Sequence, residues 1–153
     1  MEQQQTAKRN WETLILESDT TVASELLRTY EEGNIQELGE ALRIHYENSV
    51  RGAEYELLVH LKELMENIIL AKLSDKFRTQ ERWEKIVRLR REISDDLEYN
   101  DCITDDTIKE NWNNALDWAK DLAEVYIPDA IDLNELGWND ILKENYYPIE
   151  NGN

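Results

Sequence analysis

The 153-residue sequence predicts an all-α fold, a single-domain bundle of about six or seven helices. Apolar residues recur every three or four positions along most of the chain, which is the spacing of one helix face. Five glycines and two prolines are too few turn-forming residues for an all-β fold. At 41% hydrophobic, with seven Tyr and five Trp, the chain can bury a core without disulfides. We therefore expect one domain over residues 1–153, with flexible tails at 1–8 and 149–153.

Two short helices are expected first. Three apolar residues mark the first of them: Trp11, Leu14 and Ile15. The stretch Ser18-Asp19-Thr20 interrupts that pattern and supplies an N-cap for the second helix. One face of the second helix is apolar and is predicted to be buried: Val22, Ala23, Leu26, Leu27 and Tyr30. Gly33-Asn34 is the expected end of this helix, because glycine readily adopts the left-handed conformation that follows a helix.

Two longer apolar patterns follow. The first predicts a third helix with a buried stripe: Ile35, Leu38, Leu42 and Tyr46. Gly52 is expected to bend this helix or to separate it from the next one. The second pattern forms the widest apolar arc of the chain: Leu57, Leu58, Leu61, Leu64, Met65, Ile68 and Ile69. An arc this wide needs cover on more than one side, which a homodimer would supply, and the sequence leaves the oligomeric state open.

The remaining sequence predicts three more helices. Thr79 is the expected N-cap of a helix whose inward residues share one face: Trp83, Ile86, Val87, Ile93 and Leu97. After a loop at Tyr99–Ile103, Thr104 caps an amphipathic helix with its own inward face: Ile108, Trp112, Ala115, Ala119, Leu122 and Tyr126. Pro128 is expected to end that helix. A short last helix is marked by Trp138, Ile141 and Leu142.

The net charge of −17 excludes several classes of partner. It repels the phosphate backbones of nucleic acids and disfavours anionic membranes, so neither is expected as a partner. The longest apolar runs, such as Leu57-Leu58-Val59, are too short to cross a bilayer. The single cysteine, Cys102, cannot form an intramolecular disulfide, and no apolar leader follows Met1. Both features suit a cytoplasmic protein.

Basic residues are concentrated in one stretch of this acidic chain. Lys72–Glu92 contains eight basic and four acidic residues. Five of the basic residues form what we name the basic stripe, a candidate functional surface: Arg78, Arg82, Lys85, Arg88 and Arg91. We expect the basic stripe to pair with the chain's own acidic groups or with a partner protein. Binding to a phosphate backbone is the alternative.

The motifs that would identify a metal, nucleotide or catalytic site are missing. Glu-x-x-His does not occur, because Leu42 and Leu57 stand three residues before the two histidines. Neither a Gly-rich nucleotide loop nor His-Glu-x-x-His is found. A calcium loop starting at Asp96 fails, because Asp101 stands where Gly is required and Thr107 stands where Glu is required. No metal, cofactor or catalytic residue is therefore assigned.

His60 is the side chain best placed for chemistry. It lies at the edge of the apolar arc, on the side of Glu56 and Glu63. A neighbouring carboxylate can hold an imidazole in one tautomer and favour its charged form. We interpret His60 as a structural histidine bonded across a helix interface, with a general base or ligand as the alternative. His60, Glu56 and Glu63 join the basic stripe in the candidate functional surface.

The order of these features resembles the bacterial domain of unknown function 29 family. The resemblance extends from about Trp11 to Pro148 and depends on several landmarks: Leu57-Leu58-Val59-His60-Leu61, Arg82-Trp83 with Ile86 and Ile93, Trp112 with Ala115, and Trp138-Asn139-Asp140-Ile141-Leu142 with Tyr146. One departure follows the histidine, where this chain has Leu61-Lys62-Glu63-Leu64 and the family often has Leu-Leu-Lys-Trp. The resemblance implies a small helical bacterial protein and no particular reaction.

Three functions are consistent with the sequence. The first is a non-catalytic module that binds another protein through a helical face, since charge is segregated and Trp is frequent in interfaces. The second is an acidic inhibitor or antitoxin-like protein that masks a basic nucleic-acid-binding partner, which the net charge favours. The third is an enzyme that uses His60 with Glu56 or Glu63.

Overall fold

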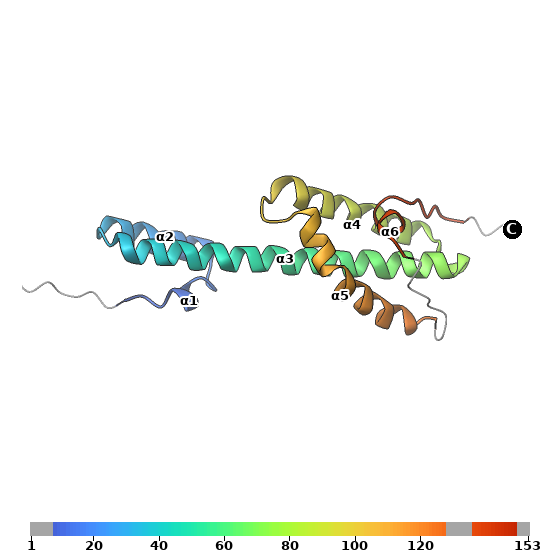
Figure 1. Ribbon diagram of the computed structural model, residues 1–153, viewed down its shortest axis with the longest axis horizontal. Coiled ribbons are helices and arrows are strands. Elements are labelled where there is room, and N and C mark those ends of the chain that lie inside the picture. Colours follow the sequence, from blue (N-terminus) through green and yellow to red (C-terminus); the bar gives the residue numbers. More distant parts are fainter. Residues whose placement is uncertain (1–7, 128–135, 150–153) are drawn as a thin grey trace, which may run out of the picture. The chain divides into compact units, whose positions relative to one another are not determined.

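The computed structural model describes residues 8–127 and 136–149 and confirms the all-α prediction. Within these ranges there are six α-helices, one short 3-10 helix and no strand (Figure 1). In chain order they are α1 (Trp11–Leu14), α2 (Asp19–Glu31), α3 (Ile35–Leu73), η1 (Asp75–Phe77), α4 (Gln80–Tyr99), α5 (Asp105–Glu124) and α6 (Trp138–Leu142). The predicted stop at Pro128 lies outside the described residues, and α5 ends at Glu124.

The predicted helix starts are confirmed by their capping bonds. The side chains of Ser18, Thr79 and Thr104 each accept a hydrogen bond from the backbone N–H three residues later. Each bond satisfies one of the N–H groups that a helix start leaves without a partner. Gly33, with φ of +72°, follows the end of α2 in the left-handed conformation that favours glycine.

The prediction that Gly52 separates two helices is wrong, and the alternative that it bends the helix stays a prediction. Helix α3 runs for 39 residues through both Gly39 and Gly52. A single glycine in a helix costs only about 1 kcal/mol relative to alanine. No capping residue or proline stands beside Gly52, so this cost does not end the helix.

The chain divides into two compact units, and the boundary between them in the sequence falls within α3. Unit 1 is Met1–Gly52 and unit 2 is Ala53–Asn153. Folding as one domain over 1–153 stays a prediction.

Most of the predicted tails lies outside the described residues, but their inner ends are bonded. Lys8 pairs with Glu40, and the Ile149 N–H donates to the Arg78 carbonyl.

Unit 1 has a small core, and the expected burial of its helices is largely wrong. Among residues 8–52, four hydrophobic residues are buried: Trp11, Ile15, Val22 and Ala41. Five side chains predicted to be buried are instead 49–65% exposed: Leu27, Tyr30, Ile35, Leu42 and Tyr46. The exposed Ala23 also departs from the prediction. The physical reason is that the α1 segment packs against another side of α2 and α3.

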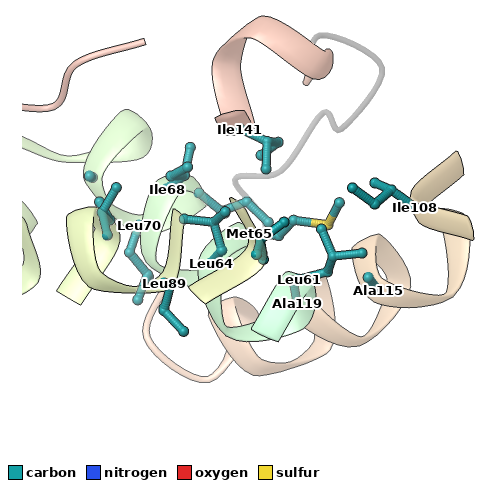
Figure 2. Close-up of a cluster of buried hydrophobic side chains, with 14 of the residues drawn as sticks. Leu61, Leu64, Met65, Ile68, Leu70, Leu89, Ile108, Ala115, Ala119 and Ile141 are labelled. Atoms are coloured by element: carbon teal, nitrogen blue, oxygen red, sulfur yellow. The ribbon is translucent and has the colours of Figure 1, made fainter. Parts of the chain in front are cut away.

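Unit 2 contains the main core, built around the C-terminal half of α3. Eighteen buried residues from α3, α4, α5, α6 and their connections form one cluster. Figure 2 shows Leu61 of α3 in the same cluster as Ala115 and Ala119 of α5. The chain's own helices thus cover the apolar arc, so this arc no longer argues for a homodimer. Three residues expected to point inward are exposed: Val87, Leu122 and Tyr126.

Candidate functional site

His60 lies against two carboxylates of α4. Its Nε2 atom is 3.6 Å from an oxygen of Glu92, and its Nδ1 atom is 3.5 Å from an oxygen of Asp96. Glu92 and Asp96 are four residues apart, so their side chains share one side of α4. The imidazole is 19% exposed. Neither contact is a hydrogen bond, and His60 Nδ1 and the nearby Asp96 oxygen are both buried without a hydrogen-bond partner among the described residues. The structural interpretation of His60 therefore stays a prediction.

The two carboxylates expected beside His60 lie elsewhere. Glu56 is exposed, and Glu63 is 3.6 Å from Lys85. Among the described residues, ion-pair distances connect His60 to neither of them. Helix spacing placed Glu56 and Glu63 on the same side of α3 as His60, but α4 packs there and supplies nearer carboxylates. The hypothesis of an enzyme that uses His60 with Glu56 or Glu63 therefore has no supporting geometry.

Three surface hollows of the described residues lie away from His60. One surface hollow of about 540 Å³ lies beside the start of α4, with Arg78, Thr79 and Pro148 in its wall. Two others lie in unit 1, beside Lys8 and beside Glu12. His60 lines none of these three. Among the described residues, no group of three or more His, Cys, Asp or Glu side chains could hold a metal ion.

The basic stripe is largely engaged within the chain. Arg82 donates to the Asn67 side chain at 2.7 Å, and Lys85 faces Glu63. Arg88 donates to Glu92 at 3.0 Å. The more exposed Arg91 is 4.0 Å from Asp95. The Arg78 guanidinium lies 5.9 Å from the centre of the Tyr146 ring. These contacts favour internal pairing over binding to a phosphate backbone.

Arg90 is a key polar residue that the sequence interpretation missed. Its Nε and Nη2 atoms donate to the carbonyls of Ile141 and Asp140, and so connect α4 to α6. Burial lowers the pKa of Arg90 below its usual range. The sequence feature that could have identified Arg90 is its position, four residues after Ile86 and three before Ile93, both of which are buried. A helix residue so spaced lies next to the buried face.

A further unusual surface is the exposed apolar side of the α2–α3 pair in unit 1. We name it the hairpin face and define it by five residues: Leu27, Tyr30, Ile35, Leu42 and Tyr46. The sequence pattern found these residues but assigned them to the core. All five are 49–65% exposed. Apolar periodicity therefore identified these five residues, but it did not show whether another part of the chain covers them.

The hairpin face lies opposite the contacts of the N-terminal segment. Arg9 contacts Glu25 on α2 and Glu37 on α3, and the Trp11 indole N–H also donates to Glu37. Glu25 and Leu27 are two residues apart, as are Glu37 and Ile35. Two residues correspond to a rotation of about 200° around a helix. On both helices the apolar side chains thus point away from the N-terminal segment.

Comparisons with protein-family models, with curated proteins and with solved structures found no match. The resemblance to the domain of unknown function 29 family therefore stays a prediction. Among the described residues, no helix combines the length and the apolar character needed to cross a membrane.

Proposed function

We propose that this chain is a non-catalytic protein-interaction module that binds through the hairpin face. The observation that carries the proposal is the exposure of five large apolar side chains on one side of α2 and α3. Aromatic side chains have areas of about 150–250 Å². Taking about 200 Å² for each of the five residues, their exposed fractions give roughly 600 Å², tyrosine hydroxyls included. That value is at the upper end for the largest apolar patch of a monomer, about 300–600 Å². Such patches commonly mark interaction sites.

The composition of the face supports the same function. Tyr30 and Tyr46 are the type of residue that is enriched in interfaces, because an aromatic ring supplies contact area with little loss of conformational entropy. The remaining side chains are aliphatic. By contrast, the polar side chains around His60 lie between two helices of unit 2.

Photo-crosslinking at the face tests the proposal. A Tyr46→p-benzoylphenylalanine variant of the full chain is illuminated in a lysate of the source organism. We expect discrete covalent adducts that disappear when Leu42→Gln is added. The matched control is the same substitution at Tyr99, which is 76% exposed but lies in unit 2. Identical adduct patterns at positions 46 and 99, or no adduct at 46, would contradict the proposal.

The acidic-inhibitor function is the second candidate, and the outer side of α5 favours it. Six acidic residues of α5 are exposed: Asp105, Asp106, Glu110, Asp117, Asp121 and Glu124. Only two basic residues occur in α5, and each pairs with one of these acids. Binding through this surface should be lost in 0.5 M salt, where the Debye length is only about 4 Å. Binding through the hairpin face should persist, because it depends on apolar contact.

A further inference from the structure

Gly39, like Gly52, has no explanation within its own chain, and its position on α3 is what distinguishes it. It lies in the interior of α3, where a glycine lowers helix stability relative to alanine. Its φ angle is not positive, so its backbone conformation does not require glycine. A methyl group built at this position meets no atom within 4 Å. Among the described residues, no contact requires the absence of a side chain at position 39.

The position of Gly39 on the helix suggests a reason. It comes four residues after Ile35, three before Leu42 and seven before Tyr46, so it lies among the residues of the hairpin face. Large side chains around a glycine leave a depression on a helix surface. A side chain from a facing helix can fill such a depression, as in knobs-into-holes packing.

We propose that the hairpin face pairs with the same face of a second copy of this chain, an inference that rests on the proposed function. Tyr46 of each copy packs over Gly39 of the other copy, and the two α3 helices run antiparallel. Tyr46 and Gly39 are separated by about 10 Å along the helix axis. A two-fold axis near Leu42, midway between them, exchanges the two positions and makes the interface self-complementary.

The area of the face fits this partner, whereas the net charge of −17 on each copy opposes the pairing. Two copies would bury roughly 1,200 Å² in total, which is at the low end for specific interfaces. At the edge of the face, Arg43 and Glu47 of one copy form an ion pair of 2.7 Å, so this edge is locally neutral. Repulsion between more distant acidic groups is screened beyond about 8 Å at physiological salt. With an area at the low end and like net charges on the two copies, we expect a weak, reversible dimer.

Sedimentation velocity of the purified full chain, from about 1 to 200 μM, tests the pairing. We expect a monomer–dimer equilibrium that Tyr46→Ala weakens at least tenfold. Gly39→Ala gives the sharpest result, because it should raise the melting temperature of the dilute monomer and weaken the dimer at least tenfold. The matched control is Gly52→Ala, since Gly52 is also in α3 with open space around it. It should stabilise the helix and leave the dimer unchanged.

The possible outcomes distinguish a failure of the second-copy inference from a failure of the proposed interaction function. A chain that stays monomeric up to 200 μM, while Tyr46 still crosslinks to another protein, overturns the second-copy inference and leaves the proposed function standing. Absence of both the dimer and the adduct overturns both. A Gly39→Ala variant that dimerises as tightly as the original chain overturns the pairing of Tyr46 with Gly39. Crosslinks from position 46 of one copy to the region around position 39 of another support it.

Discussion

Arg9 is the residue that connects the parts of unit 1. Its guanidinium contacts three carboxylates, with distances of 2.8 Å to Glu25, 2.9 Å to Glu32 and 3.6 Å to Glu37. The Arg9 side chain is only 12% exposed. Two of these carboxylates belong to or follow α2, and the third lies in α3. One cation thus compensates acidic groups from both helices.

Loss of Arg9 should destabilise unit 1. We expect Arg9→Met to lower the free energy of unfolding by about 1–3 kcal/mol, because it leaves three neighbouring carboxylates without their shared cation. Urea unfolding followed by Trp11 fluorescence, in a variant whose other tryptophans are replaced by Phe, measures the loss. Lys8→Met is the control, since Lys8 is well exposed, and its midpoint should barely change. Equal midpoints for Arg9→Met and the parent would contradict this role.

The same cluster should make the effect of Arg9 depend on pH. The hydrogen bond from Arg9 lowers the pKa of Glu32 from its usual 4.5. A carboxyl whose pKa is lowered by folding stabilises the fold above its usual pKa, and this contribution is lost as the pH falls through the folded-state value. The stability difference between the parent chain and Arg9→Met should therefore be full at pH 7 and shrink below about pH 4.5. Urea midpoints from pH 7 to pH 3 test this, and a constant difference would argue against it.

At the scale of the helix, α5 depends on small residues. Ala115, Ala119 and Ala123 are fully buried and recur every four residues, and the first two appear beside the α3 core in Figure 2. A row of methyl groups lets a helix approach its neighbour closely. The cluster of buried residues around them leaves little space for larger side chains.

Enlarging this row should disrupt the packing of α5. We expect Ala119→Leu to destabilise unit 2 by about 1–3 kcal/mol, because three added carbon atoms overfill a packed core. Asn114→Leu is the matched control, since Asn114 is an exposed residue of the same helix. Thermal unfolding by circular dichroism compares the two variants. Destabilisation of equal size at both positions would show that packing is not the cause.

The helices could be predicted from the sequence, but their partners could not. Thr79 and Thr104 were identified as caps because a capping bond joins residues only three positions apart. The periodicity of Leu42 and Tyr46 was also visible, although the side of α3 that is buried depends on where Trp11 packs. For the same reason the local pattern placed Glu56 and Glu63 near His60, while the observed neighbours come from another helix.

At the scale of the whole molecule, the two units differ in the size of their cores. Four hydrophobic residues are buried among residues 8–52 of unit 1, against eighteen in the core cluster of unit 2. Burial of apolar surface is the main favourable contribution to folding. Unit 1 is therefore expected to be the less stable of the two.

Hydrogen exchange should reveal this difference. Amides of α2 are expected to exchange faster than those of residues 57–70 in α3, because local opening is easiest where few apolar contacts are buried. Mass spectrometry of peptic fragments measures both segments in the same sample. If the hairpin face pairs as proposed, protection of α2 rises with protein concentration. Equal protection of the two segments at high dilution would contradict the difference in stability.

The continuity of α3 has a practical consequence for dissecting this molecule. Gly52 and Ala53 are consecutive residues of one helix, so the units cannot be separated by cutting a loop. A fragment that begins at Ala53 would start with four backbone N–H groups that have lost their acceptors. Adding a Ser or Asp in front of Ala53 would replace one of those acceptors. Gene fragments for this chain should therefore be designed around helix ends instead of unit boundaries.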